Sequence, residues 1–267
     1  MSTITAGRVA PETPAGAAAA PAPAIRLTGL GKRYADDGPV VLDGIDLEVA
    51  PGEFTCLLGA SGCGKSTLLS IVAGLDRPSA GTVEVAHGGA AVMFQDASLL
   101  PWLTARRNVE LALRLGGSGL SAPARRARAL ELLDVVNLAD AAEKRPHELS
   151  GGMRQRVALA RALAQDRPVL LMDEPFAALD AITRDLLHEE LQRVWRETGR
   201  TIVFVTHNVR EAVRLGQRVL LMSSRPGRIV REWQIADEGP RRIESPQVGT
   251  LSIEITEHLR REIRRNA

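Results

Sequence analysis

Apolar residues along the chain follow two patterns, one typical of buried strands and one typical of helices. Wholly or mostly apolar runs at 54–58, 169–172, 201–205 and 219–222 predict buried strands. Helical patterns lie between these runs, including the segment 183–197. Apolar strands that alternate with helices indicate an α/β fold, with a mostly parallel sheet that is covered on both faces.

A second group of segments alternates between apolar and polar residues. The alternation at 25–27, 40–42 and 45–49 predicts strands of a small antiparallel β subdomain. Two further short strands, at 82–86 and 91–94, are expected to pair as a tight hairpin. His87-Gly88-Gly89, which joins them, is typical of such a turn.

Helical patterns dominate the middle of the chain. Residues 105–115 and 122–139 both show helical spacing, and Gly116-Gly117-Ser118-Gly119 separates them. We therefore expect a helical subdomain, at about 96–165, inserted into a domain that spans 25–235.

The two ends of the chain differ from its middle. Residues 1–24 are rich in Ala and Pro and have few of the large apolar residues that a core needs, which predicts a disordered tail. Residues 236–267 form a predicted C-terminal extension. Within it, Ile255, Leu259 and Ile263 have the spacing of an amphipathic closing helix.

The composition indicates in which compartment of the cell the chain is expected. The two cysteines, Cys56 and Cys63, are too close and too differently placed for a structural disulfide, which favours a reducing cytosol. The start of the chain does not resemble a signal peptide, and no apolar run reaches the length of a membrane span. We expect the chain to stay in the cytoplasm unless a partner recruits it. A net charge of +2 gives no argument for nucleic acid as that partner.

One segment fits the phosphate-binding pattern G-x-x-x-x-G-K-S/T, between a strand pattern and a helical one. Its glycines let backbone N–H groups approach phosphate oxygens, and the following helix adds its positive dipole end. Lys65 would supply a full charge to the β- and γ-phosphates, and Ser66 would offer its hydroxyl to Mg²⁺. The segment therefore predicts an ATP site, and it resembles the loop that links a strand to a helix in the core of P-loop nucleotide hydrolases. Its residues are Gly59, Ala60, Ser61, Gly62, Cys63, Gly64, Lys65, Ser66 and Thr67.

Two carboxylates follow the predicted strand at 169–172. Asp173 is placed to hold the Mg²⁺ shell, and Glu174 to orient or deprotonate an attacking water. Because ligands of parallel sheets bind outside the carboxyl ends of the strands, Gly59, Asp173 and His207 are expected to converge there.

A second predicted anion site lies at the start of another helix. Ser150 has the position of a helix cap, and Gly151 and Gly152 expose backbone N–H groups beside it. One ATP does not need two such sites in one subunit. The sequence therefore predicts a homodimer, in which the Ser150 site of each copy closes on the nucleotide of the other.

A phosphate loop, Leu-Ser-Gly-Gly-x-x-x-Arg at 149–156, and an apolar strand ending in Asp-Glu-Pro occur here in that order. Together they resemble the ATP-binding cassette (ABC) transporter ATPases over residues 25 to about 230. The resemblance implies that Tyr34 stacks on adenine, and that Gln95 contacts Mg²⁺ and reports on the membrane partner. It also implies that Asp180 belongs to a loop exchanged across the dimer, and that His207 contacts the γ-phosphate.

This chain departs from the family pattern in two places. Asn208 stands where aspartate is common, which removes a charge beside the site. The predicted hairpin at 86–91 is also shorter than the usual insertion. We expect the second departure to trim the peripheral sheet and to leave the chemistry unchanged.

Three segments resemble the nitrate/sulfonate/taurine branch of importers: 94–104, 183–185 and 224–229. This implies two membrane-spanning permease subunits, a separate solute-binding protein, no nucleic acid, and a peripheral position on the cytoplasmic face of the membrane. Aliphatic sulfonate is the favoured substrate, with nitrate and taurine as alternatives. The apolar cluster of Leu99, Leu100, Trp102 and Leu103 is either local core or a groove for a helix of the membrane subunit.

Three other classes remain open. A soluble ABC-type ATPase of DNA repair or translation resembles this chain, but those relatives carry coiled-coil insertions or two cassettes, and one phosphate loop is present here. An exporter ATPase has the same fold, and the residues around Trp102 argue against it by resemblance. Glu174 and His207 argue against a purely regulatory nucleotide-binding module.

Overall fold

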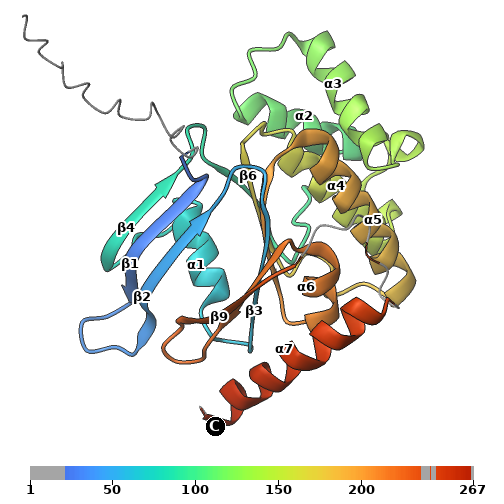
Figure 1. The fold of residues 1–267 in the computed structure, drawn as a ribbon. Coiled ribbons are helices and arrows are strands. Elements are labelled where there is room, and N and C mark those ends of the chain that lie inside the picture. The colour runs from blue at the N-terminus through green and yellow to red at the C-terminus, as the bar shows by residue number, and fades with distance from the viewer. Residues whose placement is uncertain (1–21, 236–240, 242–244, 266–267) are drawn as a thin grey trace, which may run out of the picture.

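The computed structural model describes residues 22–235, 241 and 245–265 as two sheets with helices around them (Figure 1). The central sheet has six strands, of which the first five are parallel and the last is antiparallel at the edge. In spatial order they are β5 (Ala90–Met93), β6 (Val169–Asp173), β7 (Thr201–Thr206), β3 (Phe54–Gly59), β8 (Arg218–Met222) and β9 (Ile229–Gln234). The mostly parallel sheet predicted from the apolar runs is confirmed.

Helices cover both faces of this sheet, which is why its inner strands are apolar on both sides. The helices are α1 (Lys65–Val72), α2 (Ala105–Leu115), α3 (Ala122–Val135), α4 (Gly151–Leu163), α5 (Ala181–Thr198), α6 (Val209–Leu215) and α7 (Pro246–Arg265), with short 3₁₀ turns η1 (Ala139–Ala141) and η2 (Pro146–Glu148). The predicted helix at 105–115 matches α2. The one predicted at 122–139 ends earlier, at Val135.

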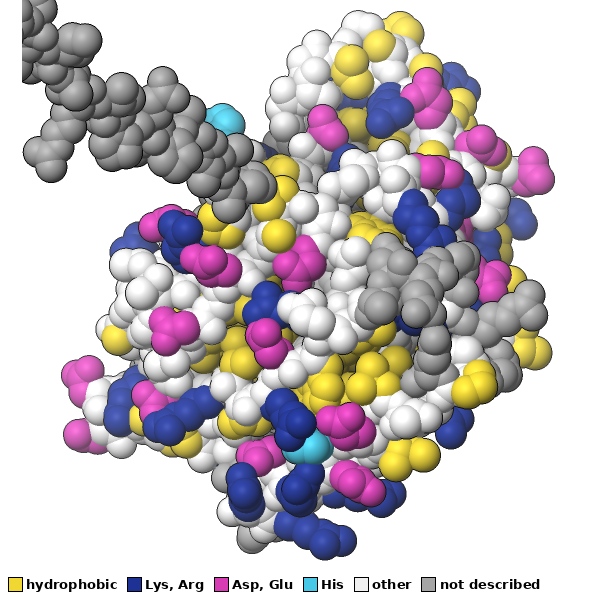
Figure 2. Space-filling model, in the orientation of Figure 1, with side chains coloured by type: hydrophobic (Ala, Val, Ile, Leu, Met, Phe, Trp, Pro, Cys, Tyr) yellow, Lys and Arg dark blue, Asp and Glu magenta, His cyan; other side chains and the backbone are white. Residues whose placement is uncertain are grey.

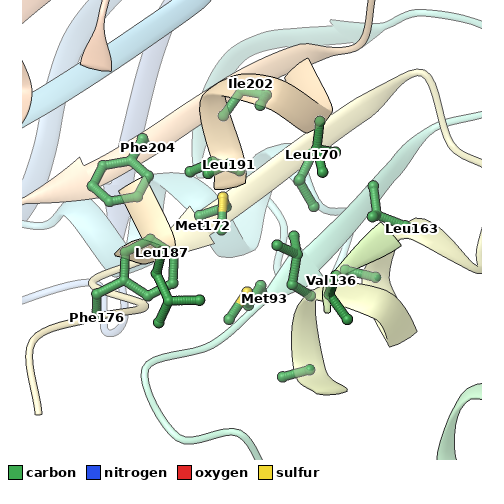
Figure 3. Packing of buried hydrophobic residues seen from close by; sticks show 14 of the residues in the cluster. Met93, Val136, Leu163, Leu170, Met172, Phe176, Leu187, Leu191, Ile202 and Phe204 are labelled. Carbon is green, nitrogen blue, oxygen red and sulfur yellow. The ribbon is translucent and has the colours of Figure 1, made fainter. Parts of the chain in front are cut away.

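Alternate residues of each central strand enter different cores. Leu170, Met172, Ile202 and Phe204 point to one face, where they pack with residues of α4 and α5 (Figure 3). Their neighbours in the same strands point to the other face and pack with α1 and with the smaller sheet. In Figure 1, α1 accordingly lies between the two sheets.

The smaller sheet is antiparallel, in the order β2 (Val40–Val49), β1 (Ile25–Arg33) and β4 (Ala80–Val85). The strands predicted at 40–42 and 45–49 form one continuous strand. Gly44, with φ 57°, lies between the two segments, and the pairing register shifts between Leu30 and Lys32 of the facing strand. A glycine accepts this left-handed backbone without the steric cost of a side chain, so the strand bends and continues.

The predicted hairpin at 86–91 is wrong. The turn exists, since Gly89 N–H donates to the Ala86 carbonyl over 2.9 Å, but the strands on its two sides do not pair. The first strand, β4, pairs with β1, whereas the second, β5, pairs with β6 in the central sheet. The turn thus passes the chain from one sheet to the other. Turn residues specify a local reversal, and they do not specify the partner of either strand.

The C-terminal part of the chain ends in α7. Ile255 of this helix is fully buried and Leu259 packs on the core, but Ile263 is 44% exposed, so the predicted apolar face stops one turn early. Trp233 of β9 donates its indole N–H to Glu254 of α7 over 2.8 Å. Lys and Arg side chains, mixed with acidic ones, gather over this end of the molecule (Figure 2).

Three further expectations concern the start of the chain, the two cysteines and membrane spans. The predicted tail at 1–24 lies, apart from its last three residues, outside the described residues. Cys56 and Cys63 are both free, as expected from their spacing, and the structure buries both. Over the described ranges, no helix combines the length and the apolar character needed to cross a lipid bilayer.

Candidate nucleotide-binding site

The phosphate-loop segment connects the end of β3 to the start of α1, as its pattern predicts. Gly62 and Gly64 have φ values of 75° and 102°, so the chain turns through the left-handed region twice within three residues. Gly64 is the N-cap of α1, and no side chain caps this helix. The N-cap residue therefore offers no side-chain acceptor to the first N–H groups of α1. They carry the positive end of the helix dipole, as an anion site requires.

Lys65 lies inside the loop. Its Nζ donates to the carbonyl oxygens of Gly59 and Ala60, both over 2.9 Å, and the side chain is buried. The same Nζ is 4.0 Å from a carboxylate oxygen of Glu174. The loop thus places a charged ammonium group between its own backbone and the acidic end of β6.

Close packing keeps the loop in this shape. A Cβ added at Gly59 would lie 2.7 Å from the Cys63 sulfur, and one added at Gly64 would lie 2.7 Å from Leu42. Burial raises the pKa of the Cys63 thiol above its ordinary value, although Lys65 partly opposes this. Cys63 therefore fills space as a neutral thiol beneath the loop.

The carboxyl ends of β6, β7 and β3 lie side by side, because β7 pairs in parallel with both of the others. Gly59 ends β3, Asp173 ends β6, and His207 directly follows β7. The predicted convergence of these three residues is confirmed by the strand order. Glu174, one residue past β6, has its carboxylate 2.9 Å from Nδ1 of His207.

The oxygen atoms at this edge suit a hard cation. Ser66 exposes its hydroxyl at the start of α1, Asp173 is half-buried, and Gln95 is exposed. Hydroxyl, carboxylate and amide oxygens are the donors that Mg²⁺ accepts. In the described part of the chain, no three His, Cys, Asp or Glu side chains form a metal site by themselves. The residues therefore fit Mg²⁺ in the way usual for nucleotide sites, where phosphate oxygens and water complete the shell.

The second predicted anion site is built as expected around a helix start. Ser150 caps α4, with its Oγ accepting the N–H of Met153 over 3.2 Å. Gly152 is buried against α5, where an added Cβ would lie 2.4 Å from Cγ2 of Thr183. Asp180 caps α5 by accepting the N–H of Thr183 over 3.0 Å. The structure thus packs the Ser150 turn and the Asp180 turn against each other within one chain.

Gln95 and Tyr34 lie nearer the edges of this region. The backbone carbonyl of Gln95 accepts the side-chain N–H of Gln155 on α4 over 2.7 Å, which connects the end of β5 to the helix that Ser150 caps. The ring of Tyr34 is 67% exposed, and its hydroxyl is 3.4 Å from Oγ1 of Thr67 in the phosphate loop. The Lys32 ammonium lies over the ring, 4.7 Å from its centroid, so the exposed ring at the mouth of the loop has one face left to stack on a base.

The apolar cluster after Gln95 is divided between core and surface. Leu99 packs on the main core, so the core interpretation holds for that residue. Trp102 is 67% exposed and Phe94 is 46% exposed, so neither belongs to the core. Exposed aromatic side chains of this kind mark contact surfaces when they lie together.

Sequence reasoning missed three buried polar residues near His207. Thr206, Glu211 and His188 are all nearly inaccessible to solvent and form a connected set of hydrogen bonds. Asn208, the departure noted in the sequence, caps α6 by accepting the N–H of Glu211 over 3.3 Å. Asparagine serves this position as well as aspartate does, because both have a side-chain oxygen for the cap.

A protein-family model described as ABC transporter matches residues 42–177, half of the chain. This chain belongs to the ABC transporter family. It is 44% identical to an aliphatic sulfonates import ATP-binding protein of Mesorhizobium japonicum, over 88% of each chain. It is 47% identical to a taurine import ATP-binding protein of Jannaschia sp., over 74% of this chain and 76% of the other.

Two more comparisons extend this finding. A nitrate import ATP-binding protein of Synechocystis sp. is 48% identical, over 80% of this chain and 82% of the other. A solved structure, the dimeric post-hydrolysis state of the ATP-binding cassette MJ0796 bound to ADP and Pi, is 35% identical with a TM-score of 0.71. It covers 79% of this chain and 99% of that one. These relatives place the chain in the sulfonate, taurine and nitrate branch of the ABC importers.

Proposed function

We propose that this chain is the ATP-hydrolysing subunit of an ABC importer. The observation that carries the proposal is the contact of Glu174 with His207, at the edge where Lys65 also lies. A phosphate-binding lysine, a carboxylate that can act as a base and a histidine that orients it are the groups that ATP hydrolysis needs. The import ATP-binding proteins among the relatives support the same activity.

The nucleotide is proposed to lie along the phosphate loop, with its phosphates on residues 59–67 and its adenine on the exposed ring of Tyr34. Ser150, Gly151, Gly152 and Asp180 of a second copy complete the site. The packing of Gly152 against Thr183 supports this grouping, because it makes the Ser150 and Asp180 turns one rigid surface. The dimeric state of the related cassette supports a homodimer.

In the proposed mechanism, Lys65 holds the β- and γ-phosphates and the N–H groups at the start of α1 orient them. Glu174 accepts a proton from the attacking water, and His207 keeps the Glu174 carboxylate directed at that water while contacting the γ-phosphate. When bound, Mg²⁺ neutralises phosphate charge, and Ser66, Asp173 and Gln95 are the residues that would hold it or its water shell.

The transported substrate is proposed to be a small oxyanion, with aliphatic sulfonate favoured and nitrate or taurine as alternatives. The partners are two membrane-spanning permease subunits and a separate solute-binding protein, with the chain on the cytoplasmic face of the membrane. The exposed rings of Phe94 and Trp102, at the edge of the proposed helical subdomain (about 96–165), offer a contact for a permease helix. Growth on a sulfonate, on taurine or on nitrate, with and without the gene, separates the three substrates.

The activity is tested by Glu174→Gln in the assembled transporter. Removing a general base is expected to lower ATP turnover by at least about 100-fold. ATP affinity should stay within about threefold, because the phosphate contacts are intact. Glu189→Gln is the matched control: this glutamate lies on α5 with a 70% exposed side chain and should leave turnover unchanged. Near-normal turnover of Glu174→Gln would reject the assigned role.

A soluble ATPase of DNA repair or translation is the second candidate. Its supporting observation is the family fold alone, which such ATPases share. Purification of the chain with nucleic acid, and without any membrane protein, is the result that would favour it.

A further inference from the structure

A chain of buried hydrogen bonds lies directly behind His207. Glu211 of α6 has 6% of its surface exposed, and each of its carboxylate oxygens has a different partner. One oxygen accepts the hydroxyl of Thr206, the residue before His207. The other is 2.6 Å from Nε2 of His188 on α5, which is 2% exposed. Because the carboxylate is an acceptor, Nε2 of His188 is the donor in this contact.

Glu211 also helps to fix Asn208, the residue after His207. The side-chain oxygen of Asn208 accepts the backbone N–H of Glu211 over 3.3 Å, and the backbone N–H of Asn208 donates to the Thr206 hydroxyl over 2.9 Å. Both residues that flank His207 are therefore bonded to Glu211 or to each other. The side chain of His207 itself is 62% exposed, and its Nδ1 lies 2.9 Å from the Glu174 carboxylate.

The rest of the His188 ring makes only weaker contacts. Its ring lies 5.7 Å from the ring of Phe176, two residues past Glu174. Its Nδ1 has no hydrogen-bond partner in the described part of the chain, and the Asp185 carboxylate lies 3.9 Å away. Arg214 occupies that carboxylate, donating to it over 2.7 Å. Thus the one strong hydrogen bond of the His188 ring is directed at Glu211.

This hydrogen-bonded set extends to the carboxyl edge of the central sheet, where Glu174 and His207 lie. Glu211 and Thr206 line a small cavity of about 30 Å³ together with residues of the site. The other lining residues are Glu174, Ala177, Arg184, His207 and Asn208. His188 lies on α5, the helix that Asp180 caps, so the set also connects the Asp180 turn to the segment that carries His207.

We propose that His188 and Glu211 are positioning residues for His207. Their hydrogen bonds fix Thr206 and Asn208, and thereby hold the His207 ring against the Glu174 carboxylate. A buried carboxylate has no water to replace a lost partner, so its geometry is fixed only while all its partners are present. The proposal rests on the proposed function, because it needs His207 to act in hydrolysis.

The test measures ATP turnover and ATP affinity of the full chain in the assembled transporter. His188→Leu removes the donor and keeps the volume, and it is expected to lower turnover about tenfold with affinity within about threefold. His188→Gln keeps a donor near the same place and should recover turnover to within about threefold of the unchanged protein. Equal loss in the two variants would contradict the proposal.

A double-variant cycle separates positioning from a general loss of structure. If His188 acts through His207, then His188→Leu has no further effect on turnover in a His207→Ala background. The same tenfold loss in that background would overturn the inference. Should His188→Leu fail to fold, Thr206→Val, which removes only the hydroxyl, takes its place in the cycle.

Glu110→Gln is the control. Glu110 is a partly buried glutamate of α2, with a 21% exposed side chain, and it pairs with Arg106 of the same helix, away from His207. Its turnover should stay within about twofold of the unchanged protein. A loss equal to that of His188→Leu would reject the proposal. Full activity of His207→Ala would instead reject the proposed function, which distinguishes the two failures.

Discussion

Glu174 has a φ of 44°, although it is not a glycine. Such a backbone conformation costs about 1–3 kcal/mol and persists only where the surrounding structure imposes it. Here the N–H of Glu174 donates to the Val205 carbonyl of the next strand over 3.0 Å, which fixes the turn. The turn directs the carboxylate to His207 and Lys65, while Asp173 stays in the strand. The strain therefore separates the roles proposed for the two adjacent acids.

Asp180 provides a prediction about pH at the scale of one residue. The N–H of Thr183, and then its side chain, lower the pKa of the exposed Asp180 carboxyl. Its folded pKa is thus below its unfolded value of about 3.9, so the charged form stabilises the fold above that pH. This stabilisation disappears as the pH falls through the folded pKa. We expect the unfolding free energies of the unchanged protein and of Asp180→Asn to differ at pH 6 and to converge below about pH 4.

The control for this measurement is Thr104→Ala, which removes an uncharged cap, that of α2. Its difference from the unchanged protein should not vary over the same pH range, because neither side chain carries a titratable group. A constant difference for Asp180→Asn from pH 6 to pH 3 would show that its charge is not linked to folding.

Residue patterns predicted the parts of the site that depend on local order. The loop at 59–67 and the cap at Ser150 each follow from a few consecutive residues, and the structure has both as expected. The contact of His188 with Glu211 joins residues that are 23 positions apart. Each of these two residues lies in a helical pattern, which shows only that its side chain is on a given face. Their pairing depends on how α5 and α6 pack, and the local sequence does not state it.

At the scale of elements, the turn at 86–89 illustrates the same limit. The glycines define the reversal, but β4 goes to the small sheet and β5 to the central one. The strand β5 is apolar on both sides, which suits a covered parallel sheet, whereas β4 has several exposed positions. The burial of each whole strand, on one face or on two, therefore decided which sheet it joins, and the turn residues did not.

The helix α7 gives a prediction at this scale. Ile255 is fully buried under it, whereas Ile253, two residues earlier, is 65% exposed. Ile255→Ala should lower the free energy of unfolding by about 2–5 kcal/mol, because it leaves a cavity. Ile253→Ala should change it by no more than about 0.5 kcal/mol. Urea unfolding of both variants measures this, and equal effects would show that α7 is not packed as described.

At the scale of the whole molecule, the proposed nucleotide site is divided between two copies of the chain. The Lys65 loop, Glu174 and His207 lie at the carboxyl edge of the central sheet, whereas the Ser150 turn packs on the Asp180 turn at the start of two helices. We propose that these two surfaces belong to different halves of each nucleotide site. Every site of the symmetric dimer then contains Lys65 from one copy and Ser150 from the other.

This account is tested most directly by mixing two inactive variants, Lys65→Ala and Ser150→Arg, and measuring ATP hydrolysis. Each variant alone forms dimers in which both sites are defective. Half of the dimers in an equal mixture are mixed, and each mixed dimer has one intact site, so about a quarter of the normal activity should return. If mass measurement shows mixed dimers and no activity returns, the two residues do not act across the dimer, and the central claim is contradicted.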